Sequence, residues 1–333
     1  MPNWIEELVY DPIQRLLSSS NKAISHFVRR DLLAEKMPPA SSLWQLTDAE
    51  RILKKQQDDG SWKYSGKKTA LYPKHHHSLL ETWKQFRLLV ERYEFTREHD
   101  GARRGAEFIF SCQTDDGDIR GMLANQYATY YTGAMMALLI KAGYADDPRI
   151  ERGFKWLLSM RQHDGGWTIP ILTHRFDRKT MYTLTSQYAK PVQPDRSKPF
   201  SHNWTGMVLR AFAAHPVYRK SKEAKAAANL LKSRFFQPDA YSSYRAASYW
   251  VRFQFWWPNL LTALDTLSFL DFTKEDHDIR KALDWFIQHQ EKNGLWRTTY
   301  VEDKKTTDNP RNGEAELWVS LAVCRVLKRF LGE

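Results

Sequence analysis

The sequence predicts an all-α protein in which tandem helix hairpins close into an α/α toroid. One observation is a short polar turn carrying Gly and an aromatic or apolar residue, which recurs after helix-like runs. A second is that an amphipathic stretch precedes each turn, and that the stretch after the turn would form a helix that is apolar on nearly every side. A third is that the final apolar run carries no polar cap. The turns span residues 56–62, 113–119, 162–167 and 290–296, with a degenerate copy at 235–241.

The helices expected before the turns, here called outer helices, carry recognisable starts. Asp147 and Pro148 begin one, since Asp caps a helix and Pro is tolerated in its first turn. Apolar residues from Ile150 onward then follow helical spacing. Ser221 and Thr273 begin later copies. We expect these helices to be exposed on one side.

The helices expected after the turns, here called inner helices, are apolar on every side and belong in an interior. They cover 132–142, 207–213, 260–270 and 317–327. A single hairpin cannot bury both faces, so neighbouring hairpins must stack. The last inner helix is as apolar as the others, which favours a ring closed through a helical lead-in at residues 1–40. The prediction is one domain over residues 1–333.

Residues 168–200 interrupt the repeat with a long stretch rich in Arg, Lys, Thr and Pro. A loop of this length inside a compact domain is usually functional or mobile. The interpretation is a lid over one mouth of the ring, and the alternative is a surface excursion with no role.

Charge and cysteine content limit the classes of partner. The net charge of +11 is compatible with nucleic acid or an anionic lipid surface, yet the basic residues are scattered in pairs and form no nucleic-acid module. We therefore expect no nucleic-acid partner and at most peripheral membrane contact. Cys112 and Cys324 make no CxxC motif, and no secretory signal or membrane-length apolar run is present. A basic cytoplasmic protein is the expectation.

The repeated Gln…Gly-x-Trp turns resemble the repeats of squalene–hopene cyclases and protein-prenyltransferase β-subunits. Residues 15–33, 143–167 and 257–283 are similar to single-domain prokaryotic proteins labelled prenyltransferase or squalene-cyclase-like. The resemblance implies a terpenoid-cyclase/protein-prenyltransferase-like toroid, in a group whose activity is unsettled. In such turns Gln satisfies helix-end groups, Gly permits positive φ and Trp packs on a helix, which is a stabilising role.

The acidic and zinc motifs of these relatives do not occur here. The chain has neither the Asp-x-Asp-Asp motif of class II cyclases nor the Asp-Asp-x-x-Asp motif of class I synthases. Neither Cys112 nor Cys324 is placed like a zinc ligand of the prenyltransferases. No metal or cofactor is predicted. The Asp residues within the turns are interpreted as turn formers.

A ligand site is expected where the inner helices begin. In a ring of hairpins these starts gather at one mouth with residues 168–200, and helix N-termini favour anions. Polar and aromatic side chains cluster near the starts, as aromatic-lined ligand pockets require. The predicted ligand-binding residues are Tyr72, Lys74, Tyr130, Tyr131, His202, Trp204, Arg252, Trp256, Trp257, Asn259 and Arg311.

Acid–base candidates are fewer. The catalytic hypothesis names His76, His77, Asp265, Glu314 and Glu316. Consecutive histidines cannot all face inward from one helix, and a capping or loop role is the alternative for each. Glu314 and Glu316 are two apart and do not share a helix face. Asp265 lies in an apolar helix, where a carboxylate needs a partner or a raised pKa unless it faces a solvated groove.

The leading hypothesis is a toroid that binds an isoprenoid or other apolar anionic ligand in a central cavity; whether it is catalytic stays open. Aromatic walls would stabilise a carbocation by cation–π contact. One alternative is a carbohydrate-active toroid of the glycosidase or lyase type with paired carboxylates. Another is a non-catalytic toroid that binds a lipid or a peptide.

Overall fold

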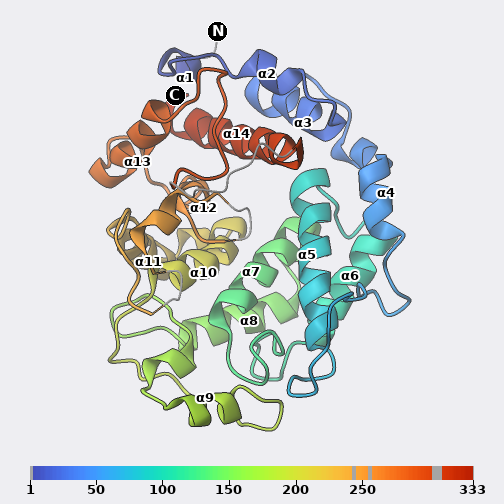
Figure 1. Cartoon of the computed structure of the whole chain (residues 1–333), viewed down its shortest axis with the longest axis vertical. Coiled ribbons are helices and arrows are strands. Elements are labelled where there is room, and N and C mark those ends of the chain that lie inside the picture. Colours follow the sequence, from blue (N-terminus) through green and yellow to red (C-terminus); the bar gives the residue numbers. More distant parts are fainter. Residues whose placement is uncertain (1–2, 242–244, 254–256, 302–309, 333) are drawn as a thin grey trace. The chain divides into compact units, whose positions relative to one another are not determined.

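The all-α class is confirmed by a computed structural model that describes residues 3–241, 245–253, 257–301 and 310–332. Across these ranges the chain forms helices and isolated bridges, and no strand (Figure 1). Two compact units are distinguished: unit 1 holds residues 1–39 and 228–333, and unit 2 holds 40–227. No helix in the described ranges is long and apolar enough to cross a bilayer. The closed ring and the single domain over 1–333 stay predictions.

The helices alternate along the chain as the repeat predicts. The outer helices are α4 (Thr47–Leu53), α6 (Asp100–Ser111), α8 (Pro148–Ser159), α11 (Lys222–Lys232) and α13 (His277–Gln288). The inner helices are α5 (His76–Tyr93), α7 (Thr129–Leu139), α10 (His202–Ala214), α12 (Leu260–Leu267) and α14 (Pro310–Leu331). The chain begins with α1 (Asn3–Glu6), α2 (Ile13–Leu17) and α3 (Lys22–Phe27), followed by a π-helical turn η1 (Val28–Leu32) and a short 3₁₀ turn η2 (Ala40–Leu43).

Burial distinguishes the inner helices α7 and α10 from the outer helix α8 in unit 2. Nearly every residue of α7 and α10 is buried, and these two helices pack closely against each other (Figure 1). The outer helix α8 buries one face, including Ile150, Phe154 and Leu157, and Asp147 caps it by accepting a bond from the Arg149 N–H. The predicted burial is confirmed for α7, α10 and α8, whereas the inner helix α5 buries only part of its surface.

The Gly turns link consecutive repeats through their Gln side chains. The Gln56 amide donates to the carbonyl of Gly60 in its own turn at 2.9 Å and to the carbonyl of Gly101 at the start of α6 at 2.8 Å. The same pair of bonds recurs at Gln113, to Gly117 and Arg149, and at Gln290, to Gly294 and Tyr10. The predicted stabilising role of Gln is confirmed, and its second bond reaches the next helix at Gly101 and Arg149 and the segment between α1 and α2 at Tyr10.

The turn tryptophans are buried and tie each turn to the outer helix before it. The indole N–H groups of Trp62, Trp167 and Trp296 donate to the carbonyls of Ile52, Leu157 and Phe286 at 2.8, 2.7 and 2.7 Å. A hydroxyl of the following inner helix accepts the backbone N–H of the same residue. These hydroxyls belong to Thr82, Thr205 and Ser320, and Thr132 does the same for Ile119 in the copy without Trp.

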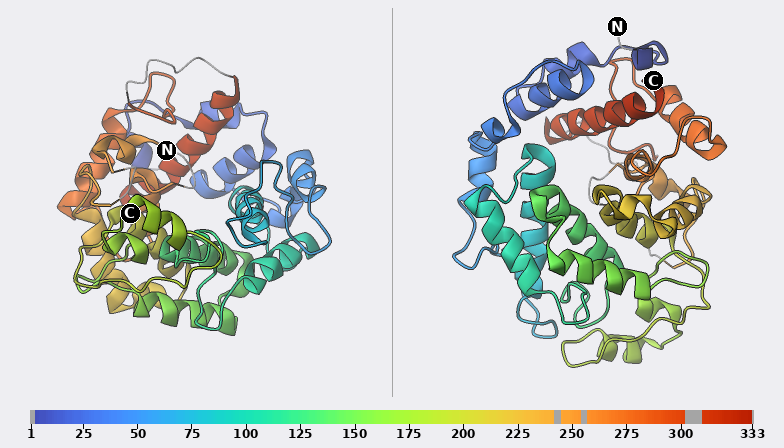
Figure 2. Two further views of the ribbon diagram at one scale, coloured as in Figure 1. Left: turned by 60° about the horizontal axis from the view of Figure 1, so that its bottom comes forward. Right: turned by 180° about the vertical axis from the view of Figure 1, so that it is seen from behind.

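The helical lead-in packs against the last repeat within unit 1, as predicted. Helices α1, α2, α3 and η1 contact α14, and the red α14 lies beside the blue α2 and α3 in Figure 2. Arg325 of α14 pairs with the Asp31 carboxylate, and Lys328 donates to the Asp31 carbonyl at 2.7 Å. Burial by itself would raise the pKa of Asp31, yet Arg325 and Arg30 outweigh it and hold that pKa below its usual value. The first and last helices are thus joined by ionic as well as apolar contacts.

Candidate functional site

The three consecutive histidines mark the start of α5 and hold a neighbouring turn. His76 is buried, and its Nδ1–H donates to the Gly121 carbonyl at 2.6 Å. The Nε2 of His75 lies 3.1 Å from the Arg120 carbonyl. The buried His77 ring packs 5.0 Å from Tyr64, and Tyr72 packs 4.3 Å from His76. The structure therefore brings Tyr72, His76 and His77 together and gives His76 a turn-holding role.

Replacing His76 by Asn is expected to reduce the loss of stability in acid. Burial is the main reason that the pKa of His76 lies below its ordinary value of 6.5, so folding favours the neutral ring. Below that ordinary value the unfolded chain binds the proton more readily, so stability falls as the pH drops through 6.5 toward the lower folded pKa. Asn keeps a donor near the Nδ1 position but cannot titrate.

The measurement is urea unfolding of the wild type and His76→Asn at pH 7.5 and 5.5. The matched control is His277→Asn, which removes a histidine whose side chain is 91% exposed. We expect the control to follow the wild-type pH profile. An equal acid loss in wild type and His76→Asn would contradict the assignment.

Four aromatic rings from three inner helices of unit 2 form a continuous row. Trp83 of α5 meets Tyr131 edge-on at 5.1 Å between ring centroids. Tyr131 lies 4.3 Å from Tyr130, and Tyr130 lies 4.4 Å from Trp204 in the first turn of α10. We call Trp83, Tyr131, Tyr130 and Trp204 the aromatic row. The starts of α7 and α10 therefore lie side by side, as predicted for these two helices.

The aromatic row is mostly buried and electrically neutral. Trp83, Tyr130 and Trp204 are buried, and Tyr131 is half-buried. Burial, with Tyr131 as a second cause, raises the pKa of Tyr130 well above its usual value, so the phenol keeps its proton. Rings in such contact offer broad apolar faces with negative π density, suited to apolar chains and to cations.

Arg87 lies at one end of the aromatic row. Neither Arg87 nor Trp83 was predicted from the sequence as a site residue. The Arg87 guanidinium carbon is 5.3 Å from the Trp83 ring centroid, and its side chain is 11% exposed. Trp83 and Arg87 lie about one helical turn apart on α5. In the sequence, Arg87 resembles a solvated charge on an amphipathic helix. A buried cation four residues after a Trp is a weak signal.

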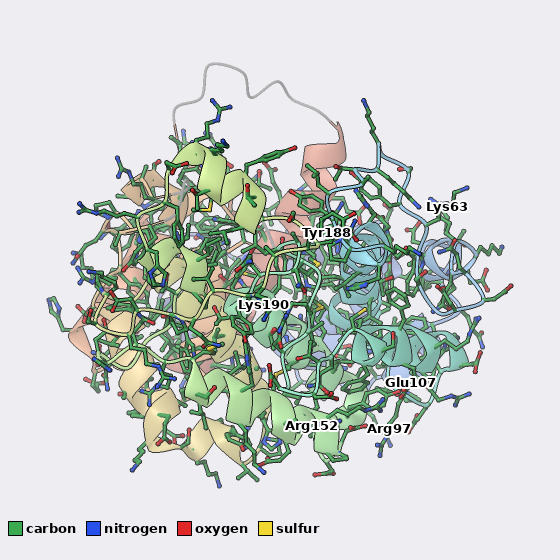
Figure 3. The ribbon with its side chains drawn as sticks, turned by 90° about the horizontal axis from the view of Figure 1, so that it is seen from below. Lys63, Arg97, Glu107, Arg152, Tyr188 and Lys190 are labelled. Atoms are coloured by element: carbon green, nitrogen blue, oxygen red, sulfur yellow. The ribbon has the colours of Figure 1, made fainter. Side chains whose placement is uncertain are left out.

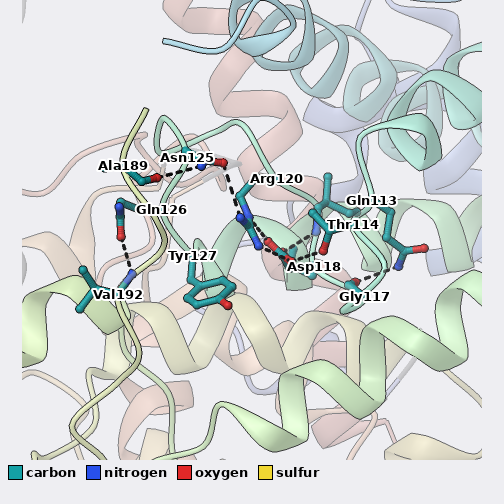
Figure 4. A network of polar contacts seen from close by, with 12 residues as sticks. Gln113, Thr114, Gly117, Asp118, Arg120, Asn125, Gln126, Tyr127, Ala189 and Val192 are labelled. Atoms are coloured by element: carbon teal, nitrogen blue, oxygen red, sulfur yellow. Dashed lines mark hydrogen bonds and ion pairs between the residues drawn. The ribbon is translucent and has the colours of Figure 1, made fainter. Parts of the chain in front are cut away.

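The segment 168–200 is folded and bonded to the repeats of unit 2. It contains a 3₁₀ turn η4 (Pro170–Thr173) and helix α9 (Arg178–Leu184). The Gln126 amide donates to the carbonyls of Leu184 and Lys190 at 2.8 and 3.0 Å. Figure 4 shows that its oxygen accepts the Val192 N–H, at 2.8 Å. Asn125 likewise donates to the Ala189 carbonyl at 2.9 Å (Figure 4). The lid stays a prediction, now of a segment with defined attachments.

The outer surface of this segment is basic and aromatic. Tyr188 is 83% exposed and Lys190 is also exposed, and both are labelled in Figure 3. Two further predicted residues of unit 2 lie at helix starts. Lys74 is exposed just before α5, and His202 is buried in the first turn of α10.

The candidates in unit 1 have mostly structural partners. Asn259 caps α12 by accepting the Thr262 N–H at 3.0 Å, and its amide donates to the Trp257 carbonyl at 3.0 Å. Trp257 is buried, and the Arg252 guanidinium lies 4.5 Å from the Tyr249 ring centroid. Trp256 and the side chain of Arg311 lie outside the described residues.

Two of the three candidate carboxylates of unit 1, Asp265 and Glu314, are engaged in an ion pair or hydrogen bonds. Asp265 is 46% exposed and pairs with Arg329 of α14. Glu314 is exposed and accepts from Asn21 at 3.0 Å and from the Trp318 indole at 3.2 Å. Glu316 is half-buried on α14. Within the described residues, no three His, Cys, Asp or Glu side chains are grouped so as to hold a metal ion.

Comparisons with known proteins find similarity only among solved structures. No protein-family model matches the chain, and no curated protein matches it. A protein from Actinoplanes is 17% identical with a TM-score of 0.42, each chain being covered over 87%. The type II terpene cyclase MstE from Scytonema is 15% identical with a TM-score of 0.43, over 87% of this chain and 83% of that one. The polysaccharide lyase BACCELL_00875 is 14% identical with a TM-score of 0.42, over 87% of both chains. These values concern the fold and do not bear on activity.

Proposed function

We propose that this protein binds an isoprenoid or another apolar anionic ligand, with the apolar chain lying along the aromatic row. The observation that carries the proposal is the unbroken contact from Trp83 through Tyr131 and Tyr130 to Trp204. The four rings come from α5, α7 and α10, which are separate in sequence and meet only through folding. Such a row presents aromatic faces along a length that suits an extended hydrocarbon chain.

The chemistry available along the row favours an apolar ligand over a sugar. Aromatic rings bind polyene chains by dispersion and by removing apolar area from water. They also stabilise positive charge through their π density, which a carbocation on the chain would need. The row itself contains no carboxylate and no acid able to protonate an alkene. Binding is therefore the proposed function, and no reaction is assigned.

The carbohydrate alternative requires two carboxyl groups about 5–10 Å apart, one of them acting as an acid. Asp265 is paired with Arg329, and Glu314 accepts bonds from Asn21 and Trp318. Both carboxylates therefore already contact other groups of the protein itself. Acidic oligosaccharides consequently serve as the contrasting ligand in the test.

The test is calorimetric titration and thermal unfolding with geranylgeranyl diphosphate and with an oligogalacturonate. We expect the prenyl compound to bind and, at a hundred times its dissociation constant, to stabilise the protein by about 2.7 kcal/mol. The oligogalacturonate should not bind. Binding of the sugar alone would refute the proposal and favour the carbohydrate alternative.

Variants of two tyrosines locate the binding. Tyr131→Leu removes the half-buried ring of the row and should weaken prenyl binding about three- to tenfold, the value of one aromatic contact. The matched control is Tyr182→Leu on α9, a tyrosine that is 63% exposed and outside the row. Equal affinities in the two variants would place the ligand elsewhere.

A further inference from the structure

The Arg87 guanidinium has buried donors that no described group accepts. Its Nε and Nη1 atoms are shielded from solvent and make no hydrogen bond within the described residues. The side chain lies against the Trp83 ring and interacts electrostatically with Tyr131, so it faces the aromatic row. Buried polar groups are otherwise almost always bonded in proteins, because water has been removed from them. A charged group left in this state points to a missing acceptor.

The Glu91 carboxylate, which lies near Arg87, does not satisfy these donors. Glu91 Oε2 is 4.0 Å from Arg87 Nε, which is beyond hydrogen-bond distance. The other oxygen of Glu91 lies 3.9 Å from Lys141 Nζ, so its charge is shared between two cations. Arg92 adds another positive charge nearby, and together with burial it lowers the pKa of Arg87. The charge of Glu91 is therefore shared with Lys141, and Arg92 adds positive charge beside Arg87.

We propose that Arg87 binds the oxyanion head group of the ligand whose apolar chain lies along the aromatic row. This inference rests on the proposed function and names the group that recognises the charged end. An arginine presents five N–H donors in a rigid plane, and diphosphate or carboxylate oxygens accept several of them at once. Diphosphate and carboxylate head groups share this chemistry, and the experiment separates them.

The burial of Arg87 against aromatic rings also predicts that the proposed anion subsite prefers a charged ligand. The cation faces rings rather than water, so an anion bound there is screened weakly and attracted strongly. A neutral alcohol head group brings one acceptor oxygen and no charge, so it satisfies the Arg87 donors less well than a diphosphate or a carboxylate. The expected preference is therefore for the prenyl diphosphate over the prenyl alcohol.

The experiment measures the affinity of the full chain for geranylgeranyl diphosphate, geranylgeranoic acid and geranylgeraniol. Arg87→Met should weaken binding of the diphosphate about ten- to a hundredfold, the value of a charge-assisted hydrogen bond or two. The affinity of the Arg87→Met variant for geranylgeraniol should stay at the wild-type value. Whichever of the diphosphate and the carboxylic acid shows the larger loss identifies the preferred head group.

Control variants separate anion binding from folding. Arg103→Met removes an arginine of α6 that is 55% exposed and paired with Asp100, and it should leave all three affinities unchanged. Without ligand, Arg87→Met should melt at or above the wild-type temperature, because it removes an unsatisfied buried charge. Glu91→Gln keeps Arg87 and removes the competing carboxylate, so it should tighten binding of the diphosphate.

Inorganic diphosphate distinguishes failure of this inference from failure of the proposed function. If the wild type binds geranylgeranyl diphosphate and the alcohol equally and Arg87→Met changes neither, the anion subsite is refuted and the apolar site stands. If neither prenyl compound binds but inorganic diphosphate binds in an Arg87-dependent manner, the proposed function fails and the subsite stands. A lower melting temperature for Arg87→Met, with no tightening in Glu91→Gln, would show that Arg87 is structural and overturn the inference.

Discussion

Replacing Trp167 by alanine is expected to lower the free energy of unfolding by about 3–5 kcal/mol, the usual cost of removing a buried Trp side chain. The ring is 0% exposed and packs 5.4 Å from Phe212 of α10. Its indole N–H donates to the Leu157 carbonyl of α8 at 2.7 Å. The residue therefore joins an outer helix to the next inner helix, and its loss opens a cavity between them.

Guanidinium unfolding followed by circular dichroism measures the effect. Trp167→Phe is the matched variant, since it keeps most of the apolar volume and loses the bond to Leu157. It should cost about 1 kcal/mol for the bond, plus the cost of an imperfect fit. A loss below 1 kcal/mol in the alanine variant would contradict the role of Trp167 as a link between repeats.

Replacing Gly117 by alanine should cost at least about 2 kcal/mol, because strain and a clash act together. The backbone φ of Gly117 is +110°, a conformation that alanine rarely adopts. A Cβ atom there would lie 2.5 Å from the Arg152 carbonyl oxygen of α8. Neither the turn nor the outer helix can move away without breaking the Gln113 bonds to Gly117 and Arg149.

The control is Gly313→Ala on α14, where an added Cβ meets no atom within 4 Å. A glycine in a helix costs up to about 1 kcal/mol relative to alanine, so this variant should be neutral or more stable. Both variants are measured by the same denaturant titration. Similar stabilities for Gly117→Ala and wild type would show that the turn adapts, against the repeat geometry described above.

The repeat architecture could be predicted because it depends on local signals. The start of α8 is signalled by Asp147 before Pro148, and each Gly turn by a few adjacent residues. In the structure, α8 begins and the turns lie at the positions that these signals predict. The apolar runs likewise identify α7 and α10 as interior helices. The boundaries differ by a few residues, since helix starts depend on caps such as Ser201, which accepts the Trp204 N–H.

The candidate site was predictable only in part. Tyr130, Tyr131 and Trp204 lie near inner-helix starts, so their meeting follows from the stacking of α7 on α10. Trp83 and Arg87 lie deep in α5, and their place depends on which face of that helix meets α7. That face is set by packing between helices far apart in the sequence, and local periodicity does not specify it.

The histidines also show that the sequence does not specify which long-range bonds a side chain makes. His76 attracts attention as a titratable group, yet its Nδ1–H is used on the Gly121 carbonyl. Residues 168–200 looked irregular in sequence, whereas Gln126 and Asn125 anchor them through bonds spanning more than fifty positions. Long-range bonds of this kind leave no signature in composition or spacing.

The central claim is that an apolar anionic ligand lies along the aromatic row of unit 2, and photo-crosslinking tests it most directly. A prenyl diphosphate carrying a diazirine in its chain would be irradiated with the protein, and the labelled peptides identified by mass spectrometry. The account predicts labels on Trp83, Tyr130, Tyr131 or Trp204 that excess geranylgeranyl diphosphate suppresses. Suppressible labels confined to α9 or to residues 228–333 would contradict it.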